Sequence, residues 1–154
     1  MRKKYIILSI ASLVILLDQI TKFLITGNFY FCESVPVIKN VFHITYVTNT
    51  GTAFSMFAGY GKWLMLVVVA ALVIIYVHLM KHRESIPASS LIAFSLILGG
   101  GMGNLIDRIF RGAVVDFIDF RIWPVFNVAD SAITVGMATI ILFSFIRRKN
   151  RCVG

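Results

Sequence analysis

Charged residues, acidic residues in particular, and cysteines are all scarce in this sequence. Only 14% of its 154 residues are charged, whereas 58% are hydrophobic, and the mean hydropathy is +0.87. This composition excludes an ordinary soluble domain, in which about a quarter of the residues carry a charge. The lipid bilayer is the solvent that it fits. One compact unit is expected at this length, so we predict a single membrane-embedded domain over residues 1–154.

The motifs of several common protease chemistries are also missing. The sequence contains neither the G-x-S-x-G of serine hydrolases nor the H-E-x-x-H of zinc proteases. Its two cysteines, Cys32 and Cys152, have no zinc-type spacing. His78 and His82 are four residues apart, which would allow a shared metal ion, but they lie at the basic end of an apolar run, far from the aspartates. We favour interfacial anchoring for this pair and packing for His43, and expect no metal and no cofactor.

The net charge of +8 comes from short basic clusters and not from one extended basic surface. The clusters are residues 2–4, 81–83 and 147–151, and each flanks an apolar run. This arrangement is typical of cytoplasmic membrane anchoring. We therefore expect no nucleic-acid partner, although the charge alone would suggest one.

Four apolar runs are long enough to cross a bilayer. They cover about residues 5–25, 63–80, 88–106 and 127–146. If the N-terminus is cytoplasmic, all three basic clusters are also cytoplasmic, as the positive-inside rule requires. The sequence thus predicts an all-α integral membrane protein with four transmembrane helices and both termini in the cytoplasm. Cys32 and Cys152 then lie on opposite sides of the membrane and do not pair.

The first predicted outer loop, residues 27–62, contains a β-branched and aromatic stretch at 41–47 that indicates a strand. We expect a small extracytoplasmic β-sheet, formed largely by this loop, at the membrane surface.

The first 32 residues have an alternative interpretation as a lipoprotein signal peptide, with a basic start, an apolar stretch and a cysteine. Two features argue against cleavage. Tyr30 and Phe31 are bulky where a cleavage site needs small residues, and Asp18 and Lys22 interrupt the apolar stretch. We therefore expect this segment to be retained as the first span.

Five polar patches interrupt the apolar sequence, all on its predicted outer side. Ionisable residues in or beside a span are costly and indicate function. In the first patch, Asp18 and Lys22 share a helix face and can pair. This pair either reaches toward the outer interface or supports a neighbouring site. In the second patch, Asn49 precedes Gly51, and this spacing fits a simple turn as well as a site.

The third patch, residues 99–108, ends the third span. Gly99 and Gly103 predict close helix packing. Packing does not explain Asn104, Asp107 and Arg108 at the end of a span. Asn104 and Arg108 are one turn apart and share a helix face.

The last two patches contain Asp116, within an apolar stretch, and Asp130, at the start of the fourth span. Taken alone, Asp130 is best explained as a helix N-cap, and Asp119 as a solvated loop charge. Together, two carboxylates in a desolvated site share one proton. The ionised carboxylate can take a proton from water while the protonated one polarises the scissile carbonyl. Such a pair predicts an aspartic peptidase.

Two alternatives remain open at this point. Intramembrane aspartates also serve proton relays, so a small proton- or ion-conducting protein is the second hypothesis. A conduction path needs polar residues through the full membrane depth, and the second span has almost none. A purely structural subunit, with Asp18–Lys22 and Asp107–Arg108 as ties between helices, is the third. This third hypothesis leaves Asp116 unexplained.

Read in order, the five patches resemble the bacterial lipoprotein signal peptidase family (signal peptidase II). The matching segments are DQITK at 18–22, NTGTAF at 49–54, GGGMGNLIDR at 99–108, VVDF at 114–117 and FNVAD at 126–130. The resemblance implies that Asp116 and Asp130 are the catalytic pair. It also implies that a set of polar residues binds substrate or supports the site, namely Asp18, Lys22, Asn49, Asn104, Arg108 and Asn127.

The resemblance further implies an enzyme of the bacterial cytoplasmic (inner) membrane with its active site toward the outer face. Its substrate would be a diacylglyceryl-modified prolipoprotein, cut before the lipidated cysteine. Other expected partners are membrane lipid and the cyclic peptide inhibitor globomycin, and a monomer is the expected state. We assign Asp130 as the base and Asp116 as the carrier of the shared proton. Only residues 117–129 separate the two aspartates, which is short for the family.

Overall fold

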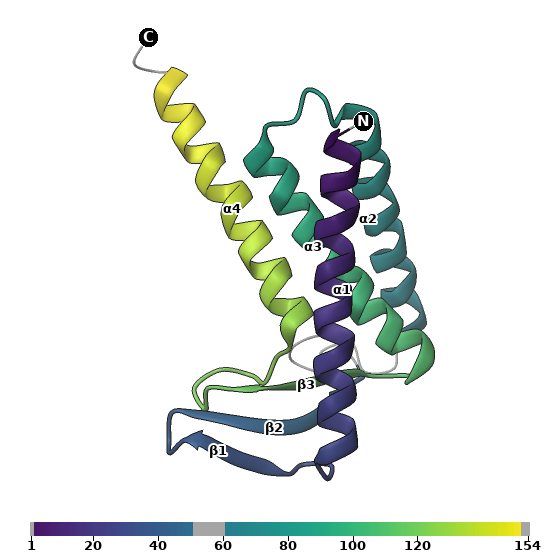
Figure 1. Cartoon of the computed structure of the whole chain (residues 1–154), viewed down its shortest axis with the longest axis vertical. Helices are drawn as coiled ribbons and strands as arrows, with labels where there is room; N and C mark the ends of the chain where they lie inside the picture. The colour runs from purple at the N-terminus through teal and green to yellow at the C-terminus, as the bar shows by residue number, and fades with distance from the viewer. Residues whose placement is uncertain (1, 51–60, 152–154) are drawn as a thin grey trace.

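Four long helices form a bundle that carries a small sheet at one end (Figure 1). The computed structural model describes residues 2–50 and 61–151. Its helices are α1 (Arg2–Asn28), α2 (Gly61–His82), α3 (Ala88–Phe110) and α4 (Val128–Arg151). All four are long and apolar enough to cross a membrane, which confirms the prediction of four helices of this kind.

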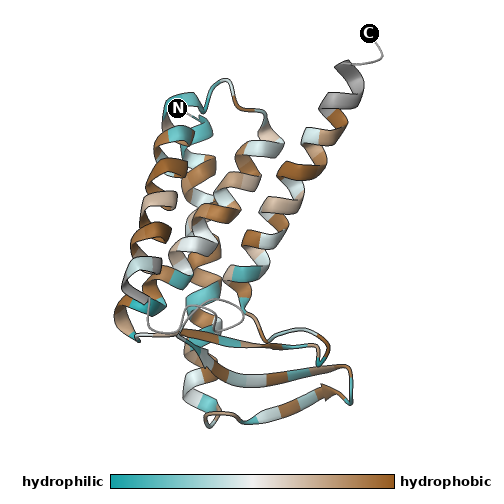
Figure 2. Ribbon diagram, turned by 180° about the vertical axis from the view of Figure 1, so that it is seen from behind, coloured by the Kyte–Doolittle hydropathy of each residue, from teal (hydrophilic) through white to brown (hydrophobic). Residues whose placement is uncertain are grey.

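The central helix of the bundle is α3, which contacts each of the other three helices. In the most apolar stretch of α3, 56% of the residues are buried inside the protein, against 28% or less in the corresponding stretches of the other helices. Large apolar side chains such as Leu17, Ile74 and Phe145 are exposed. The bilayer supplies the apolar solvent that these surfaces require. Figure 2 shows apolar residues along most of each helix and hydrophilic residues where the helices approach the sheet.

Glycines allow the neighbouring helices to approach α3 closely. A Cβ at Gly99 would lie 2.8 Å from a backbone oxygen of α1. A Cβ at Gly100 would overlap the carbonyl oxygen of Ala129 in α4, and one at Gly103 would lie 2.6 Å from Asp18 Oδ2. The packing role predicted for Gly99 and Gly103 is therefore confirmed.

The sheet contains three antiparallel strands in the order β1 (Ser34–Ile38), β2 (Phe42–Asn49) and β3 (Val114–Asp119). The first two strands precede α2, and β3 lies between α3 and α4. The strand predicted at 41–47 is thus confirmed, as is a sheet formed largely by the segment between the first two spans.

A second apolar cluster fixes the sheet to the end of α1. Ile25 of α1 packs with Val115 and Phe117 of β3, all of them buried. Successive side chains of a strand point to opposite faces. Asp116, between these two residues, therefore faces away from the cluster and toward the start of α4.

The start of α1 and the end of α4 lie at the end of the bundle opposite to the sheet (Figure 1). Lys3 Nζ donates hydrogen bonds to the carbonyl oxygens of Glu84 and Ile86, at 2.8 and 3.1 Å. These bonds join the start of α1 to the connection between α2 and α3. The basic clusters at 2–4 and 81–83 consequently lie at the same end of the molecule.

Replacing Gly100 by Ala is expected to lower the free energy of unfolding by about 1–3 kcal/mol, because the added methyl overlaps a backbone oxygen of α4 and forces the helices apart. Thermal unfolding in detergent measures the effect. Gly27→Ala is the matched control, since a Cβ there meets nothing within 4 Å. Equal stability of the two variants would contradict the close packing of α3 on α4.

Candidate active site

A fully buried lysine lies between α1 and α3 near the sheet. Lys22 Nζ contacts Asp18 Oδ2 and Asp107 Oδ2, both at 2.8 Å, and donates a hydrogen bond to Asn104 Oδ1 at 3.0 Å. Lys22, Asp18 and Asp107 have no exposed surface. An ammonium group has three N–H donors, and each has an acceptor here. The predicted Asp18–Lys22 pair is therefore confirmed, but the interpretation that it reaches toward the interface is wrong because α3 encloses it.

Gln19 and the more exposed Arg111 complete this ion cluster. Arg111 Nη1 pairs with Asp107 Oδ1 and donates to Gln19 Oε1 at 3.1 Å. Gln19 Nε2 donates to Asp18 Oδ2 at 3.2 Å and to Asp107 Oδ1 at 3.1 Å. Two cations thus balance two carboxylates, so each charge of this cluster has a counter-charge. Gln19 and Arg111 were not predicted as site residues, although the four-residue spacing of Asp107 and Arg111 is typical of a helix ion pair.

Two asparagine amides connect the ion cluster to the aspartates. Asn104 Oδ1 accepts from Lys22 Nζ and from Asn127 Nδ2, the latter at 3.1 Å. The Asn104 amide nitrogen is therefore turned toward Asp130 Oδ1, 2.7 Å away. Asn127 Nδ2 also donates to Asp116 Oδ1 at 2.6 Å. Reversing the Asn104 amide would set its N–H groups against the lysine ammonium, so Lys22 fixes its orientation.

The first turn of α4 is capped from outside the helix. Asn127 Oδ1 accepts the N–H of Asp130 at 2.8 Å, and Asp18 Oδ1 accepts the N–H of Ala129 at 2.9 Å. Asn127 is therefore the N-cap. The alternative in which Asp130 is the cap is wrong, because α4 begins at Val128 and places Asp130 within the first turn. The positive end of the helix dipole still favours a carboxylate there.

Asp116 is buried in β3 with only 3% of its surface exposed. Burial and, to a smaller extent, the charge of Asp130 raise the pKa of its carboxyl to about 7. Hydrogen bonds from Asn127 and Asn49 and the charge of Lys22 act in the opposite direction. The pKa of Asp116 therefore lies near neutral pH, as expected of a carboxyl that shares a proton with another.

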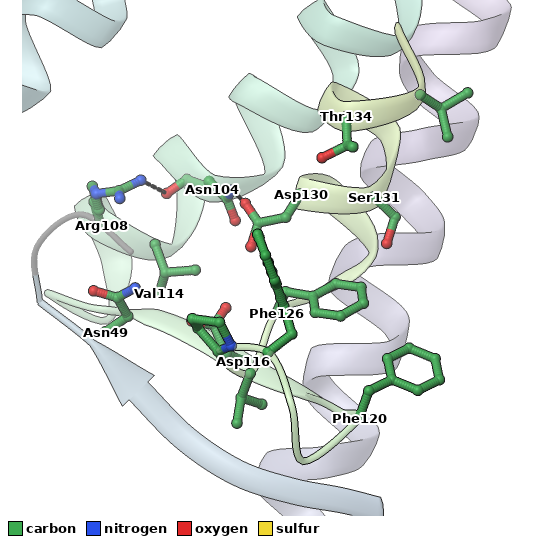
Figure 3. A pocket seen from close by; sticks show the side chains of 14 residues that line it. Asn49, Asn104, Arg108, Val114, Asp116, Phe120, Phe126, Asp130, Ser131 and Thr134 are labelled. Atoms are coloured by element: carbon green, nitrogen blue, oxygen red, sulfur yellow. Dashed lines mark hydrogen bonds between the residues drawn. The ribbon is translucent and has the colours of Figure 1, made fainter. Parts of the chain in front are cut away.

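Both aspartates line a cavity of about 650 Å³ between the bundle and the sheet (Figure 3). Polar lining comes from Asn49 of β2 and from Asn104 and Arg108 of α3. Arg108 Nη1 donates to the carbonyl oxygen of Asn104 at 3.2 Å. Phe120 and residues 123–126 provide an apolar lining on the connection between β3 and α4. The cavity therefore combines two carboxyl groups, hydrogen-bonding groups and a surface for hydrocarbon.

The eight predicted site residues gather in this region. Those that line the cavity are Asn49, Asn104, Arg108, Asp116 and Asp130. The other three lie behind the cavity. Lys22 contacts Asn104, Asn127 contacts Asp116, and Asp18 accepts a hydrogen bond from the first turn of α4.

Asp119 is not the solvated loop charge that the sequence suggested. It ends β3 and is only 3% exposed. Burial acts to raise the pKa of its carboxyl, but hydrogen bonds from Thr45 and from the backbone N–H and guanidinium of Arg121 outweigh it and lower the pKa. Asp119 is therefore a fixed, ionised group within the sheet.

Other sequence features have less connection with the cavity. The imidazole rings of His78 and His82 lie 5.0 Å apart in α2, and His43 Nδ1 contacts Ser34 Oγ at 3.2 Å. Across residues 2–50 and 61–151, no three His, Cys, Asp or Glu side chains are placed to hold a metal ion. The remainder of the second polar patch, residues 51–54, lies outside the described residues, and so does Cys152.

Comparison with known proteins gives consistent results. A family model described as signal peptidase (SPase) II matches residues 10–146. A lipoprotein signal peptidase from Halothermothrix orenii is 44% identical, over 89% of this chain and 93% of its own length. The protein of the same name from Moorella thermoacetica is 48% identical, over 84% of this chain and 86% of its own length.

Solved structures agree with these matches. A bacterial membrane enzyme determined by the in meso method at 2.3 Å resolution superposes with a TM-score of 0.87. Its sequence is 32% identical, and the match covers 94% of this chain and 90% of the other. The similarity therefore includes the arrangement of helices and sheet around the cavity.

Replacing Lys22 by Met is expected to lower the free energy of unfolding by about 3–5 kcal/mol, because it leaves buried carboxylates without their main counter-charge. Chemical or thermal unfolding in detergent measures this loss. Lys39→Met, at an exposed site, is the control and is expected to unfold like the wild type. Adding Asp18→Asn to Lys22→Met removes one of the two carboxylate charges and is expected to restore part of the loss. A Lys22→Met protein as stable as the control would contradict the role of the ion cluster.

Proposed function

Because the chain belongs to the signal peptidase II family, we propose that Asp116 and Asp130 are the catalytic pair of an aspartic endopeptidase. The chain removes signal peptides from lipoprotein precursors, the activity that its family and its relatives share. The observation that carries the assignment of the pair is that both carboxyl groups line one cavity and are joined through two amides.

The proposed reaction begins with a water molecule between the two carboxyl groups. Asp130, as carboxylate, takes a proton from this water, and the water oxygen attacks the scissile carbonyl carbon. Protonated Asp116 donates its proton to the carbonyl oxygen, which gives a neutral gem-diol. On collapse, Asp130 returns its proton to the leaving amide nitrogen and Asp116 regains one from the diol. The pair ends in its starting protonation state.

The polar lining of the cavity suits a peptide backbone. Asn49 hydrogen-bonds to Asp116, and Arg108 borders the same space. We assign both, together with Asn104, to binding substrate carbonyl groups next to the scissile bond. Asp18, Lys22 and Asn127 support the pair from behind. The raised pKa of Asp116 supports its assignment as the proton carrier, because a carboxyl with a pKa near 7 holds a proton more readily than an ordinary one.

The bundle end that carries the sheet would face away from the cytoplasm. The basic clusters at 2–4 and 81–83 lie at the opposite end, which the positive-inside rule assigns to the cytoplasm together with both termini. We place the protein in the bacterial inner membrane as a monomer with surrounding lipid. The substrate is a prolipoprotein with a diacylglyceryl group on its cysteine, cut on the N-terminal side of that residue. Globomycin is expected to inhibit the enzyme.

Asp116→Asn and Asp130→Asn are each expected to abolish cleavage, with a loss of at least about a thousandfold in kcat, because neither half of the pair acts alone. The assay follows cleavage of a diacylglyceryl-modified prolipoprotein by protein purified in detergent. Asp18 lies behind the cavity. Asp18→Asn therefore keeps the carboxyl groups of Asp116 and Asp130 and is expected to retain more activity than either of the other two variants. Full activity in a folded Asp116→Asn or Asp130→Asn protein would remove that residue from the mechanism.

The pH dependence of kcat/KM is expected to show a loss of activity as the pH rises above about 7. The direction follows from the raised pKa of Asp116, since above it the acid of the pair loses the proton that it must donate. In Asp130→Asn, which lacks the neighbouring charge, the pKa of Asp116 is expected to fall; carboxyl-stretch infrared titration measures it. An unchanged pKa would show that the two groups do not interact, and activity that rises through pH 8 would reverse the assignment of the acid.

A further inference from the structure

The loop at residues 120–125, called here the wall loop, forms an apolar side of the cavity. Its base is closed by Ile118 and Phe126, whose backbones exchange hydrogen bonds of 2.7 and 3.1 Å. Phe120, Trp123 and other apolar residues of the loop line the cavity that also contains the two aspartates. A short loop with a closed base therefore presents hydrocarbon-binding surface beside the reacting groups.

Asp119 holds the first turn of the wall loop. Its Oδ1 accepts the backbone N–H of Arg121 at 2.8 Å, and its Oδ2 accepts the guanidinium of the same residue at 3.0 Å. Arg121 has a φ of +64°, a conformation that a residue with a Cβ rarely adopts. Two hydrogen bonds to one buried carboxylate hold Arg121 in this conformation and so direct the chain that follows.

Hydrogen bonds between side chains of all three strands hold Asp119 in place. Thr45 Oγ1 of β2 donates to Asp119 Oδ2 at 2.8 Å and lies 2.7 Å from Ser34 Oγ of β1. Because the Thr45 proton is used toward the carboxylate, Ser34 is the donor in the second contact. The wall loop is therefore tied to the whole width of the sheet and not only to the end of β3.

Aromatic contacts hold the lining side chain at the start of the loop. The ring of Phe120 lies 5.2 Å from that of Phe42 in β2 and 6.0 Å from that of Phe126, with the last two stacked at 23°. Figure 3 shows Phe120 and Phe126 on the side of the cavity below Asp130. A ring held between two others presents a fixed surface to whatever occupies the cavity.

From these contacts, and resting on the proposed function, we infer that Asp119 is a positioning residue that holds the wall loop, and that Phe120 and Trp123 of this loop bind hydrocarbon of the substrate beside the aspartate pair. The hydrocarbon has two possible sources, an apolar side chain of the signal peptide or an acyl chain of the lipid. Both are apolar and both must lie close to the cleaved bond. The wall loop would thus set which substrates are accepted by size, while the aspartates set the chemistry.

The first experiment tests the wall directly with Trp123→Ala and Phe120→Ala. The matched control is Ile122→Ala, in the same loop, because Ile122 is 93% exposed and does not line the cavity. Two substrate sets are compared, one with a single peptide and acyl chains of different length, the other with a single lipid and Ala or Leu before the cysteine. In one of the two sets, Trp123→Ala and Phe120→Ala are expected to lower the ratio of kcat/KM for the larger substrate to that for the smaller one by roughly tenfold. The change is expected in KM.

The outcome also identifies the source of the hydrocarbon. A preference lost only in the acyl series assigns the wall to lipid, and one lost only in the peptide series assigns it to the signal peptide. Unchanged preferences in both series, with Trp123→Ala behaving like Ile122→Ala, would overturn the inference and leave Trp123 as an interfacial residue.

The second experiment tests Asp119 as a positioning residue. Asp119→Ala is expected to raise KM for the preferred substrate several-fold with little change in kcat. Adding Arg121→Gly is expected to restore KM in part, because glycine adopts a positive φ without a carboxylate to hold it. A lower unfolding temperature with unchanged KM, or a raised KM that the glycine does not restore, would count against the positioning role.

Failure of the inference is distinguishable from failure of the proposed function. Wild type, Asp116→Asn and Asp130→Asn are assayed with the same substrates. If the wild type cleaves and the two aspartate variants do not, while the wall variants keep wild-type preferences, only the inference about the wall loop is wrong. If the aspartate variants remain active, the proposed catalytic pair is wrong whatever the wall variants do.

Discussion

Burial of the Lys22 ammonium is the constraint on which the rest of the structure depends. A cation without exposed surface must meet opposite charge, and here it meets Asp18 of α1 and Asp107 of α3. Each carboxylate has a second task. Asp18 accepts the N–H of Ala129 in the first turn of α4, and Asp107 accepts the N–H of Val115 in β3 at 3.1 Å. One set of buried charges thus fixes the four elements that carry the aspartate pair.

Lys22 is linked to Asp116 and Asp130, the proposed catalytic pair, through asparagine amides and not by direct contact. A cation in contact with a carboxylate strongly favours its ionised form, and a pair with both members ionised would have no acid to donate. Asn104 and Asn127 separate Lys22 from the two aspartates. Each aspartate therefore accepts a hydrogen bond from a neutral, oriented amide N–H and not from the lysine ammonium. The two carboxyl groups are therefore held in place without direct contact with a cation, as the proposed shared proton requires.

Local sequence patterns predicted the spans, the strand at 41–47, the glycine packing and the Asp18–Lys22 pair, because each follows from spacing within one helix or strand. The errors concern contacts between distant segments. Asp119 was interpreted as a solvated charge, yet its partner Thr45 lies 74 positions earlier in the chain. The third strand was not predicted, because 114–118 is a short apolar run without alternation. The position of Asp130 depended on where α4 begins, and the Asn127 side chain decides that.

The location of the cavity follows from two requirements that oppose each other. Hydrolysis needs water and groups that ionise, whereas the proposed lipid-bearing substrate needs a hydrocarbon surface. Deep in the bundle, ionised groups and water are too costly. Beyond the sheet, a hydrocarbon surface is missing. At the junction, β2 and α3 supply amides and a guanidinium, while the wall loop and Phe126 supply most of the apolar lining. The sheet is therefore part of the proposed active site, since without it the cavity would lack Asp116 and its apolar wall.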